Sequence, residues 1–171
     1  MIKVRRGYDV YESKLLGPIG MVVSELGLER IFLLEENLST YLESHPDIRR
    51  DEVICQNVKA QLEAYFLGQR RAFDIPLVLN GTPFRMQVWE ALRRIPFAKT
   101  RTYGDLARMI SNPKACRAVG GANRANPIPI VIPCHRVIGA NGKLVGFLGE
   151  KIEIKECLLA HEKSVLDKKL K

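Results

Sequence analysis

The sequence has no long hydrophobic run. Its longest apolar stretches, such as residues 128–133, are far shorter than the roughly 20 residues that a helix needs to cross a bilayer. The first seven residues also lack the apolar core of a signal peptide. These absences argue against a membrane-spanning or secreted protein, and we expect a cytoplasmic protein that does not bind membranes.

Cysteine and histidine are scarce and widely spaced. The chain has no Cys-x-x-Cys pair and no zinc-type pairing of cysteine with histidine. The cysteine density is also too low for a disulfide-stapled secreted domain. We therefore expect no disulfide framework and no metal site from these residues, which are Cys55, Cys116, Cys134, Cys157, His45, His135 and His161.

Acidic residues are scarce in the second half of the chain. Residues 1–80 hold 10 basic and 12 acidic side chains, whereas residues 81–171 hold 17 basic and 7 acidic ones. Within 84–143 the only acids are Glu90 and Asp105, against 11 basic side chains. A basic module joined to a slightly acidic one favours a polyanionic partner for the basic half. The alternative is an ordinary solvated surface.

Hydrophobic periodicity predicts an α+β chain with two domains, 1–80 and 81–171. Short strands are expected over residues 4–34, interrupted by glycines. A helix is expected from about Asp51, because apolar residues recur every four positions up to Phe66 and Gly68 follows. The turn cluster at 80–83 marks the expected boundary.

Two short helices joined by a tight turn form a helix-turn-helix pattern in the second domain. Thr102 is expected to cap the first helix with Asp105 as its partner, and Asn112 to cap a second helix over 114–124 with Pro113 at its first position. On the second helix Arg117, Gly121 and Arg124 share one face. The pattern favours DNA contact, although ordinary helix packing also produces it.

Cys134 is the candidate nucleophile. An apolar, proline-stiffened strand at 128–133 is expected to deliver it beside His135, which can remove the thiol proton. Arg136 is expected to favour the reactive thiolate, and Glu162 is the candidate for orienting the base. The alternative is a buried thiol without a chemical role. The other three cysteines are expected to be core or bystander thiols.

The run Asn126-Pro-Ile-Pro-Ile-Val-Ile-Pro-Cys134-His-Arg-Val-Ile-Gly139 resembles the active-site signature of the O6-alkylguanine-DNA alkyltransferases, also called methylated-DNA–protein-cysteine methyltransferases. Further segments are similar to the same family in the same order, so that residues 81–162 are covered almost throughout and 53–77 more loosely. These segments are Gly81-Thr-Pro-Phe-Arg-Met-Gln-Val-Trp89, Ile95-Pro96, Thr102-Tyr103-Gly104, Arg117-Ala-Val-Gly-Gly121-Ala122 and Cys157-Leu-Leu-Ala-His-Glu162.

The resemblance implies a ribonuclease-H-like N-terminal domain with a small antiparallel sheet and helices. It also implies a mostly helical, winged-helix-like C-terminal domain with the helix-turn-helix, which binds the minor groove of double-stranded DNA and flips the damaged guanine out of the duplex. Arg117 would fill the vacated space in the stack. Small residues suit the narrow groove, and the implied DNA-binding residues are Arg117, Tyr103, Ala118, Gly121, Ala122, Asn123 and Arg124.

The resemblance also implies the chemistry. Cys134 attacks the alkyl carbon in line, and His135 takes part in a proton relay through a water held by Glu162. Tyr103 hydrogen-bonds the leaving guanine, and Asn126 ties the recognition helix to the active-site segment. Val137 lies where the base edge is read. The alkyl group stays on the cysteine, so each molecule, expected to be a monomer without a cofactor, acts once.

The sequence departs from the family at the glycine-rich substrate loop. Phe147, Leu148 and Gly149 replace the usual aromatic-small-Gly-Gly run, with one extra residue before the last helix. We predict a narrower pocket that accepts methyl better than bulky groups such as benzyl. Two other functions remain open: a non-catalytic binder of alkylated DNA, and a thiol hydrolase acting on a small substrate.

Overall fold

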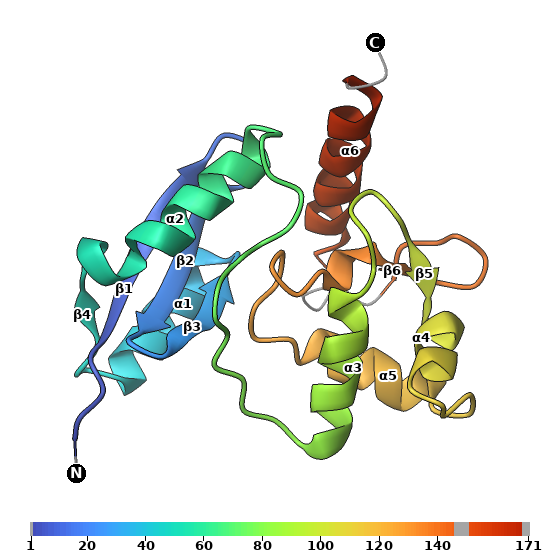
Figure 1. Ribbon diagram of the computed structural model, residues 1–171, viewed down its shortest axis with the longest axis horizontal. Coiled ribbons are helices and arrows are strands. Elements are labelled where there is room, and N and C mark those ends of the chain that lie inside the picture. Colours follow the sequence, from blue (N-terminus) through green and yellow to red (C-terminus); the bar gives the residue numbers. More distant parts are fainter. Residues whose placement is uncertain (1, 146–150, 169–171) are drawn as a thin grey trace. The chain divides into compact units, whose positions relative to one another are not determined.

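The computed structural model describes residues 2–145 and 151–168 of the chain. The chain forms two compact units, Met1–Leu79 and Asn80–Lys171 (Figure 1). No helix within the described residues is long and apolar enough to span a membrane. The pocket loop at Phe147, Leu148 and Gly149 lies outside the described residues.

The first unit is a four-stranded sheet with a helix on each face. Two antiparallel hairpins join β1, β2 and β3, and β4 pairs with β1 in parallel, giving the order β3-β2-β1-β4. The predicted antiparallel sheet is therefore confirmed for three strands and extended by a short parallel one. The elements are β1 (Arg6–Ser13), β2 (Gly17–Ser24), β3 (Gly27–Phe32), α1 (Glu35–Ser44), β4 (Arg49–Arg50) and α2 (Glu52–Phe66).

The helices of this unit cover opposite faces of the sheet. Gly7 lies against α2, where a Cβ atom would meet Asp51 and Ile54, and Gly20 lies against Leu38 of α1. Residues 7 and 20 belong to opposite faces in the β1–β2 register, and Figure 1 shows α2 and α1 on the two sides. The side chain of Asp51 caps α2 by accepting from the backbone N–H of Ile54, so the predicted helix is confirmed.

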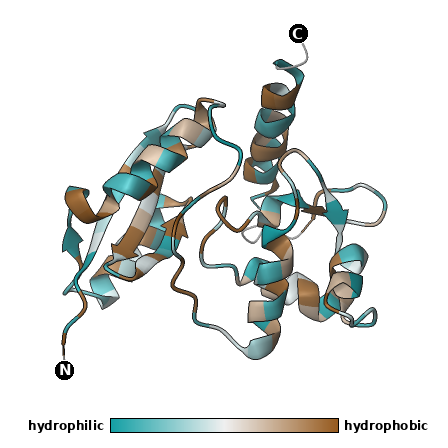
Figure 2. Cartoon of the chain, viewed as in Figure 1, coloured by the Kyte–Doolittle hydropathy of each residue, from teal (hydrophilic) through white to brown (hydrophobic). Residues whose placement is uncertain are grey.

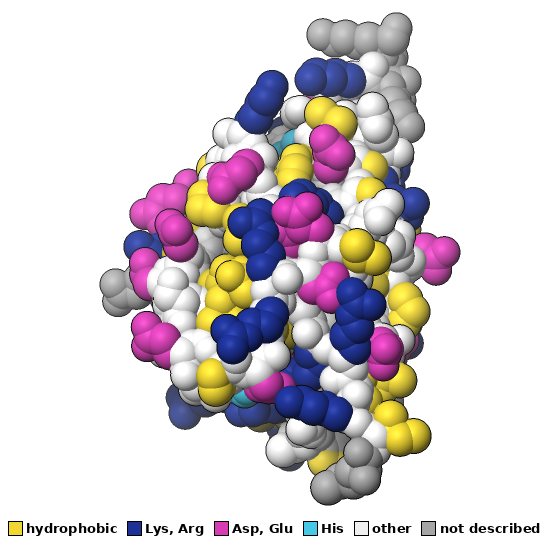
Figure 3. All heavy atoms as spheres, turned by 90° about the vertical axis from the view of Figure 1, so that its left-hand side faces the viewer, with side chains coloured by type: hydrophobic (Ala, Val, Ile, Leu, Met, Phe, Trp, Pro, Cys, Tyr) yellow, Lys and Arg dark blue, Asp and Glu magenta, His cyan; other side chains and the backbone are white. Residues whose placement is uncertain are grey.

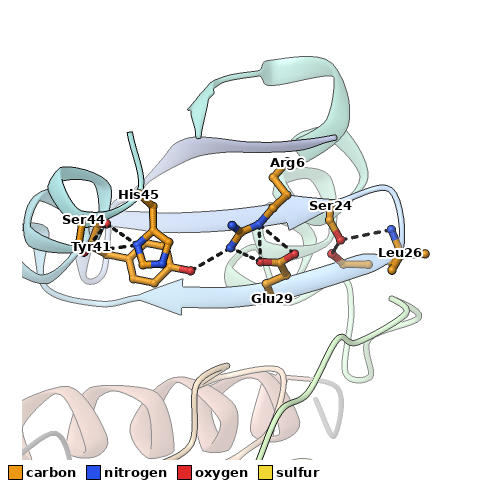
Figure 4. A network of polar contacts seen from close by, with 8 residues as sticks. Arg6, Ser24, Leu26, Glu29, Tyr41, Ser44 and His45 are labelled. Carbon is orange, nitrogen blue, oxygen red and sulfur yellow. Dashed lines mark hydrogen bonds and ion pairs between the residues drawn. The ribbon is translucent and has the colours of Figure 1, made fainter. Parts of the chain in front are cut away.

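Ion pairs connect the strands of the first unit to each other and to its helices. Arg6 of β1 reaches Glu29 of β3 at 2.7 Å and donates to the hydroxyl of Tyr41 in α1, as Figure 4 shows. On the other face the fully buried Asp9 pairs with Arg50 and Lys59, each at 3.0 Å. On the face drawn in Figure 3, acidic and basic side chains are interspersed rather than separated.

The second unit is mostly helical and confirms the predicted α+β class with a helical C-terminal part. Hydrophobic and hydrophilic residues alternate along its helices (Figure 2), and the buried indole of Trp89 donates to the carbonyl of Ala122 at 2.9 Å, joining α3 to α5. Its elements are α3 (Pro83–Arg93), β5 (Arg101–Thr102), α4 (Tyr103–Met109), α5 (Cys116–Arg124), a 3-10 helix η1 (Cys134–Arg136), β6 (Val137–Ile138) and α6 (Ile152–Lys168).

The helix-turn-helix is formed by α4 and α5. The predicted capping box of Thr102 and Asp105 is confirmed, because each side chain accepts from the other's backbone N–H. The predicted start of the second helix is wrong. Asn112 does not cap it; its carbonyl accepts from the N–H of Ala115 in the preceding turn, so α5 begins at Cys116.

Candidate active site

Cys134 is the first residue of η1 and lies 4% exposed at the end of an apolar loop. The predicted strand at 128–133 is wrong: the segment makes turns and a single isolated bridge. Two prolines remove backbone donors from it, and Asn126 binds it instead, donating to the carbonyl of Ile132 at 2.8 Å and accepting from the N–H of Ile128. Ile130 has a φ of 74°, a costly conformation for a β-branched residue. The loop that presents the thiol is therefore strained and braced by Asn126.

His135 and Glu162 are in direct contact inside the second unit. His135 Nε2 lies 2.7 Å from Glu162 Oε1, and both side chains are fully buried. The resemblance implied a relay through a water held by Glu162; in the structure the carboxylate also binds the imidazole directly. A carboxylate only accepts hydrogen bonds, so Nε2 carries the hydrogen and Nδ1 is a free acceptor. Nδ1 is buried and has no hydrogen bond within the described part of the chain.

Arg136 secures the same carboxylate. Its guanidinium donates to both oxygens of Glu162 at 2.8–3.2 Å and to the carbonyl of Ile95 at 2.7 Å, and the N–H of Ala98 adds a further bond. Burial opposes the charge on Glu162, but His135 and Arg136 outweigh it and hold the pKa of the carboxyl well below its usual range. Glu162 is therefore a fixed anion that orients His135.

Burial raises the pKa of the Cys134 thiol to about 11. The expectation that Arg136 favours the thiolate is wrong, because its guanidinium is engaged by Glu162 and Ile95. The thiol is protonated at neutral pH, so attack requires that its proton be removed during the reaction. Burial also lowers the pKa of His135, which keeps the imidazole neutral and able to accept that proton.

Lys155 is a cation whose charge lowers the pKa of the Cys134 thiol. It was not predicted from the sequence. Its side chain is fully buried, Nζ donates to the carbonyl of Val145 at 3.1 Å, and burial lowers its pKa to about 8 while the charge of a Cys134 thiolate opposes this. The sequence of α6 does contain a signal for this buried lysine. Residues 155, 158, 162 and 165 share one face of α6, and two charges on an otherwise apolar buried face indicate an internal polar site.

Tyr103 is brought to Cys134 by a short parallel pairing. Arg101 pairs with Val137 and Thr102 with Ile138, so β5, which leads into Tyr103, lies beside the strand that follows Cys134 and η1. The Tyr103 hydroxyl donates to the carbonyl of Val145 at 2.9 Å. Burial and the neighbouring Cys134 raise the pKa of the phenol. Val137, the partner of Arg101, is fully buried.

The second helix of the helix-turn-helix exposes small and basic residues. Arg117, Ala118 and Arg124 are exposed, whereas Ala122 and Asn123 are buried. A Cβ atom at Gly121 would meet nothing within 4 Å, so internal packing among the described residues does not require a glycine there. A surface hollow of about 570 Å³ is lined by Tyr103, Cys116, Arg117, Gly120, Arg124 and Val145.

Two of the remaining cysteines differ in their burial. Cys55 is buried in α2 of the first unit, as expected of a core thiol. Cys116 is exposed at the first residue of α5, so of the two roles expected for it, core or bystander thiol, it does not have the first. No group of three or more His, Cys, Asp or Glu side chains that could hold a metal occurs within residues 2–145 and 151–168.

Two family models match the chain. Residues 7–79 match the ribonuclease-like domain of 6-O-methylguanine DNA methyltransferase, and residues 83–164 match the DNA-binding domain of the same family. Together they cover nearly the whole chain, with the site described above inside the second match.

Characterised relatives and solved structures agree with these models. The methylated-DNA–protein-cysteine methyltransferase of Methanosarcina acetivorans is 45% identical over 92% of this chain and 98% of its own. The constitutive enzyme of Bacillus subtilis is 43% identical over 86% and 90%. The crystal structure of Mycobacterium tuberculosis OGT in complex with DNA superposes with a TM-score of 0.82 at 41% identity, covering 93% of this chain and 94% of that one.

Proposed function

The chain belongs to the 6-O-methylguanine DNA methyltransferase family, and from that premise we propose that Cys134 is the residue that receives the alkyl group. The protein repairs DNA by transferring the alkyl group of O6-alkylguanine to itself. The observation that carries the assignment of Cys134 is its position beside the buried His135–Glu162 pair, with an unpaired Nδ1 on the imidazole.

The transfer proceeds by a single displacement. As the thiol proton passes to His135 Nδ1, directly or through one water, the sulfur attacks the alkyl carbon. A carbon–sulfur bond forms, and the bond between that carbon and O6 breaks. The electron pair remains on the guanine, whose developing negative charge is met by the Tyr103 hydroxyl. For this the phenol must leave the carbonyl of Val145, which holds it in the free protein.

Glu162 and Arg136 prepare His135 for that proton. The Glu162 anion stabilises the imidazolium as it forms, and Arg136 and the N–H of Ala98 prevent the carboxylate from turning away. Lys155 adds a positive charge that stabilises the sulfur as its proton leaves. Lys155 and Asn126 thereby oppose part of the desolvation that makes the buried thiol a poor acid.

The second unit supplies the DNA-binding surface in this proposal. The exposed face of α5 carries Arg117 to occupy the space left by the flipped base, and Arg124 near its end. Ala118 and Gly121 leave room for the close approach of the minor groove. Flipping is required because the O6 alkyl carbon is inaccessible within the base stack.

Each molecule acts once, because the alkyl group stays on Cys134 through a stable carbon–sulfur bond. The damaged base is itself the alkyl donor, so the proposed reaction uses no cofactor. We place the protein in the cytoplasm as a monomer, where its positive second half gives it access to DNA.

The test is a single-turnover reaction with duplex DNA that carries methyl-labelled O6-methylguanine. We expect the intact protein to gain the mass of one methyl group, mapped to Cys134, and Cys134→Ala to gain none. Cys55→Ala is the matched control and keeps full transfer. Label on another residue, or binding of the duplex without transfer, contradicts the proposal. Repeated turnover indicates a hydrolase instead.

A further inference from the structure

Strand β1 has an open edge in the first unit. The sheet order places β4 beside β1, but β4 pairs only with Gly7 and Tyr8, and the chain then enters α2. The rest of β1, residues 9–13, runs on past β4 (Figure 1), and no strand within the described residues pairs with it on this side. An edge strand of this kind is a template for pairing with another extended segment.

The backbone groups at the open edge belong to alternate residues. The carbonyl of Tyr8 accepts from the N–H of Asp51 on this side, so Val10 and Glu12 direct their N–H and C=O groups to the same side. The N–H of Val10 is hydrogen-bonded to the carboxylate of Asp9. An antiparallel partner of Val10 would need that N–H. A strand parallel to β1, in the line of β4, uses only the Val10 carbonyl and the two groups of Glu12, which favours the parallel arrangement.

The open edge lies in a groove between the two helices. The groove measures about 1010 Å³ and is lined by residues 8–12 of β1 and by one side each of α1 and α2. Its walls carry apolar side chains, among them Leu38 and Leu42 from α1 and Val53 from α2, which is 72% exposed. A free strand edge flanked by apolar side chains fits an extended peptide.

The groove is acidic. Its lining holds five acidic and two basic side chains. The two basic ones, Arg50 and Lys59, are both paired with the buried Asp9. Three glutamates of the lining are exposed and make no ion pair within the described residues, namely Glu12, Glu35 and Glu63. This charge disfavours a phosphate-bearing ligand and favours lysine and arginine.

We propose that the groove binds an extended segment of a partner protein that carries lysine or arginine, and that this segment adds a parallel strand to the open edge of β1. Val10 and Glu12 supply the main-chain hydrogen bonds, and the glutamates of the lining attract the basic side chains. A second copy of the chain does not fit. Pairing of β1 with its own copy about a two-fold axis is antiparallel and brings the same glutamates together.

The proposal goes beyond repair of the base. Basic, flexible tails are common in proteins that bind nucleic acids. A groove for such a tail would let the first unit hold the repair protein beside a partner that is already on DNA.

The first test measures the binding of two fluorescent, capped seven-residue peptides to the full chain by fluorescence anisotropy. One peptide alternates lysine and arginine with valine, and the other alternates glutamate with valine. We expect saturable binding of the basic peptide, and binding of the acidic peptide that is weaker by roughly tenfold or more.

A charge reversal in the groove has a matched control on the same helix. Glu35→Lys should weaken binding of the basic peptide roughly fivefold. Glu36→Lys changes an exposed neighbour that does not line the groove, and it should leave binding unchanged. Both variants should transfer a methyl group at the wild-type rate.

The second test addresses strand addition. Only alternate N–H groups of an added strand face β1, so two versions of the basic peptide are N-methylated, one at the odd and one at the even positions. We expect one version to lose binding and the other to keep it. Glu12→Pro, which removes an N–H at the edge, should abolish binding, whereas Glu12→Thr keeps the N–H and should only weaken it.

Absence of binding by the basic peptide overturns the proposal, as does equal binding of the basic and acidic peptides. Equal binding of the two methylated versions does so as well, and that comparison holds even if Glu12→Pro fails to fold. Equal effects of Glu35→Lys and Glu36→Lys place the peptide outside the groove. A doubled mass of the peptide-free protein in analytical ultracentrifugation, abolished by Glu12→Pro, assigns the edge to a second copy instead.

Discussion

Cys55 in the first unit and Cys134 in the second are both buried thiols, and burial raises the pKa of both. Cys55 lies near the carboxylates of Asp9 and Asp51, which oppose a negative sulfur further and bring its pKa to about 12. Cys134 has Lys155, backbone N–H groups and Asn126 in their place, and its pKa is about 11. The surrounding groups, rather than the thiol's own acidity, separate a core residue from a nucleophile.

Among the residues that the structure describes, each unit also buries one carboxylate, and the two carboxylates differ in their partners. Asp9 pairs with Arg50 and Lys59, whose side chains are 57% and 39% exposed. Glu162 pairs with His135 and Arg136, which are buried with it. An exposed partner can be replaced by water, whereas a buried one cannot. We therefore expect the loss of the charge on Glu162 to destabilise the fold more than the loss of the charge on Asp9.

The largest expected effect comes from removing the charge of Glu162. Glu162→Gln leaves Arg136 as an uncompensated buried cation, and we expect a loss of stability of about 3–5 kcal/mol. The same change removes the anion that supports His135, so the transfer rate should fall roughly 100-fold or more. Denaturant unfolding and single-turnover kinetics measure the two effects.

Asp9→Asn is the matched control for that experiment. Its partners reach solvent, so we expect a loss near 1 kcal/mol and an unchanged transfer rate. If Asp9→Asn slows transfer as much as Glu162→Gln does, the distinction between the two carboxylates is wrong.

Next in size is Lys155→Met, with the exposed Lys163→Met on the same helix as its control. Removing the cation near the sulfur should slow transfer roughly tenfold, because the thiolate loses its stabilising charge. The folded pKa of Lys155 lies below the ordinary value of 10.5, so burial of the charged lysine destabilises the protein at neutral pH. The variant should gain roughly 2–3 kcal/mol below pH 8, and the gain should shrink between pH 8 and 10.5. A variant that is both slower and less stable would contradict this account.

A smaller effect is expected from pH. With His135 accepting the thiol proton, the transfer rate should be nearly constant from just above the lowered pKa of His135 to about pH 8. Above pH 8 it should decline, because Lys155 loses its charge. Stopped-flow rates on O6-methylguanine duplex over pH 6–9 provide the check. A tenfold rise per pH unit across neutrality would mean that the proton goes to solvent and that His135 is not the base.

The smallest effect is expected from Cys55→Ala. The thiol is packed in α2 against the sheet, so its loss should cost about 1 kcal/mol and leave the transfer rate unchanged. Thermal unfolding and the transfer assay measure the two quantities. A slower transfer would show that the first unit influences Cys134.

Local sequence signals predicted α2 and the capped start of α4, but neither α1 nor the start of α5. The Thr102–Asp105 box and the Asp51 start of α2 depend only on residues within one turn. The loop at 128–133 could not be predicted in this way, because its apolar composition suits a strand and its path is decided by prolines and by the side chain of Asn126. Its placement of Ile130 at positive φ is a tertiary outcome.

The site residues were predicted by resemblance to known motifs, and their electrostatics were not. Arg136 follows His135 in the sequence and was expected to act on the thiol, but its reach to Ile95 and Glu162 depends on how α6 packs. The burial of Lys155 depends on the same packing. The high pKa of Cys134 follows from desolvation, which no short motif encodes.

That high pKa has a consequence for a protein that is consumed by its own reaction. A thiolate exposed to the solvent would react with oxidants and free alkylating agents, and every such event would waste a molecule. A protonated thiol at 4% exposure is a poor target for them, whereas Cys116 at the surface is an accessible one. The burial that slows the chemistry thus protects the thiol from side reactions before it meets DNA. The single reaction of each molecule then takes place with a base that has entered the pocket.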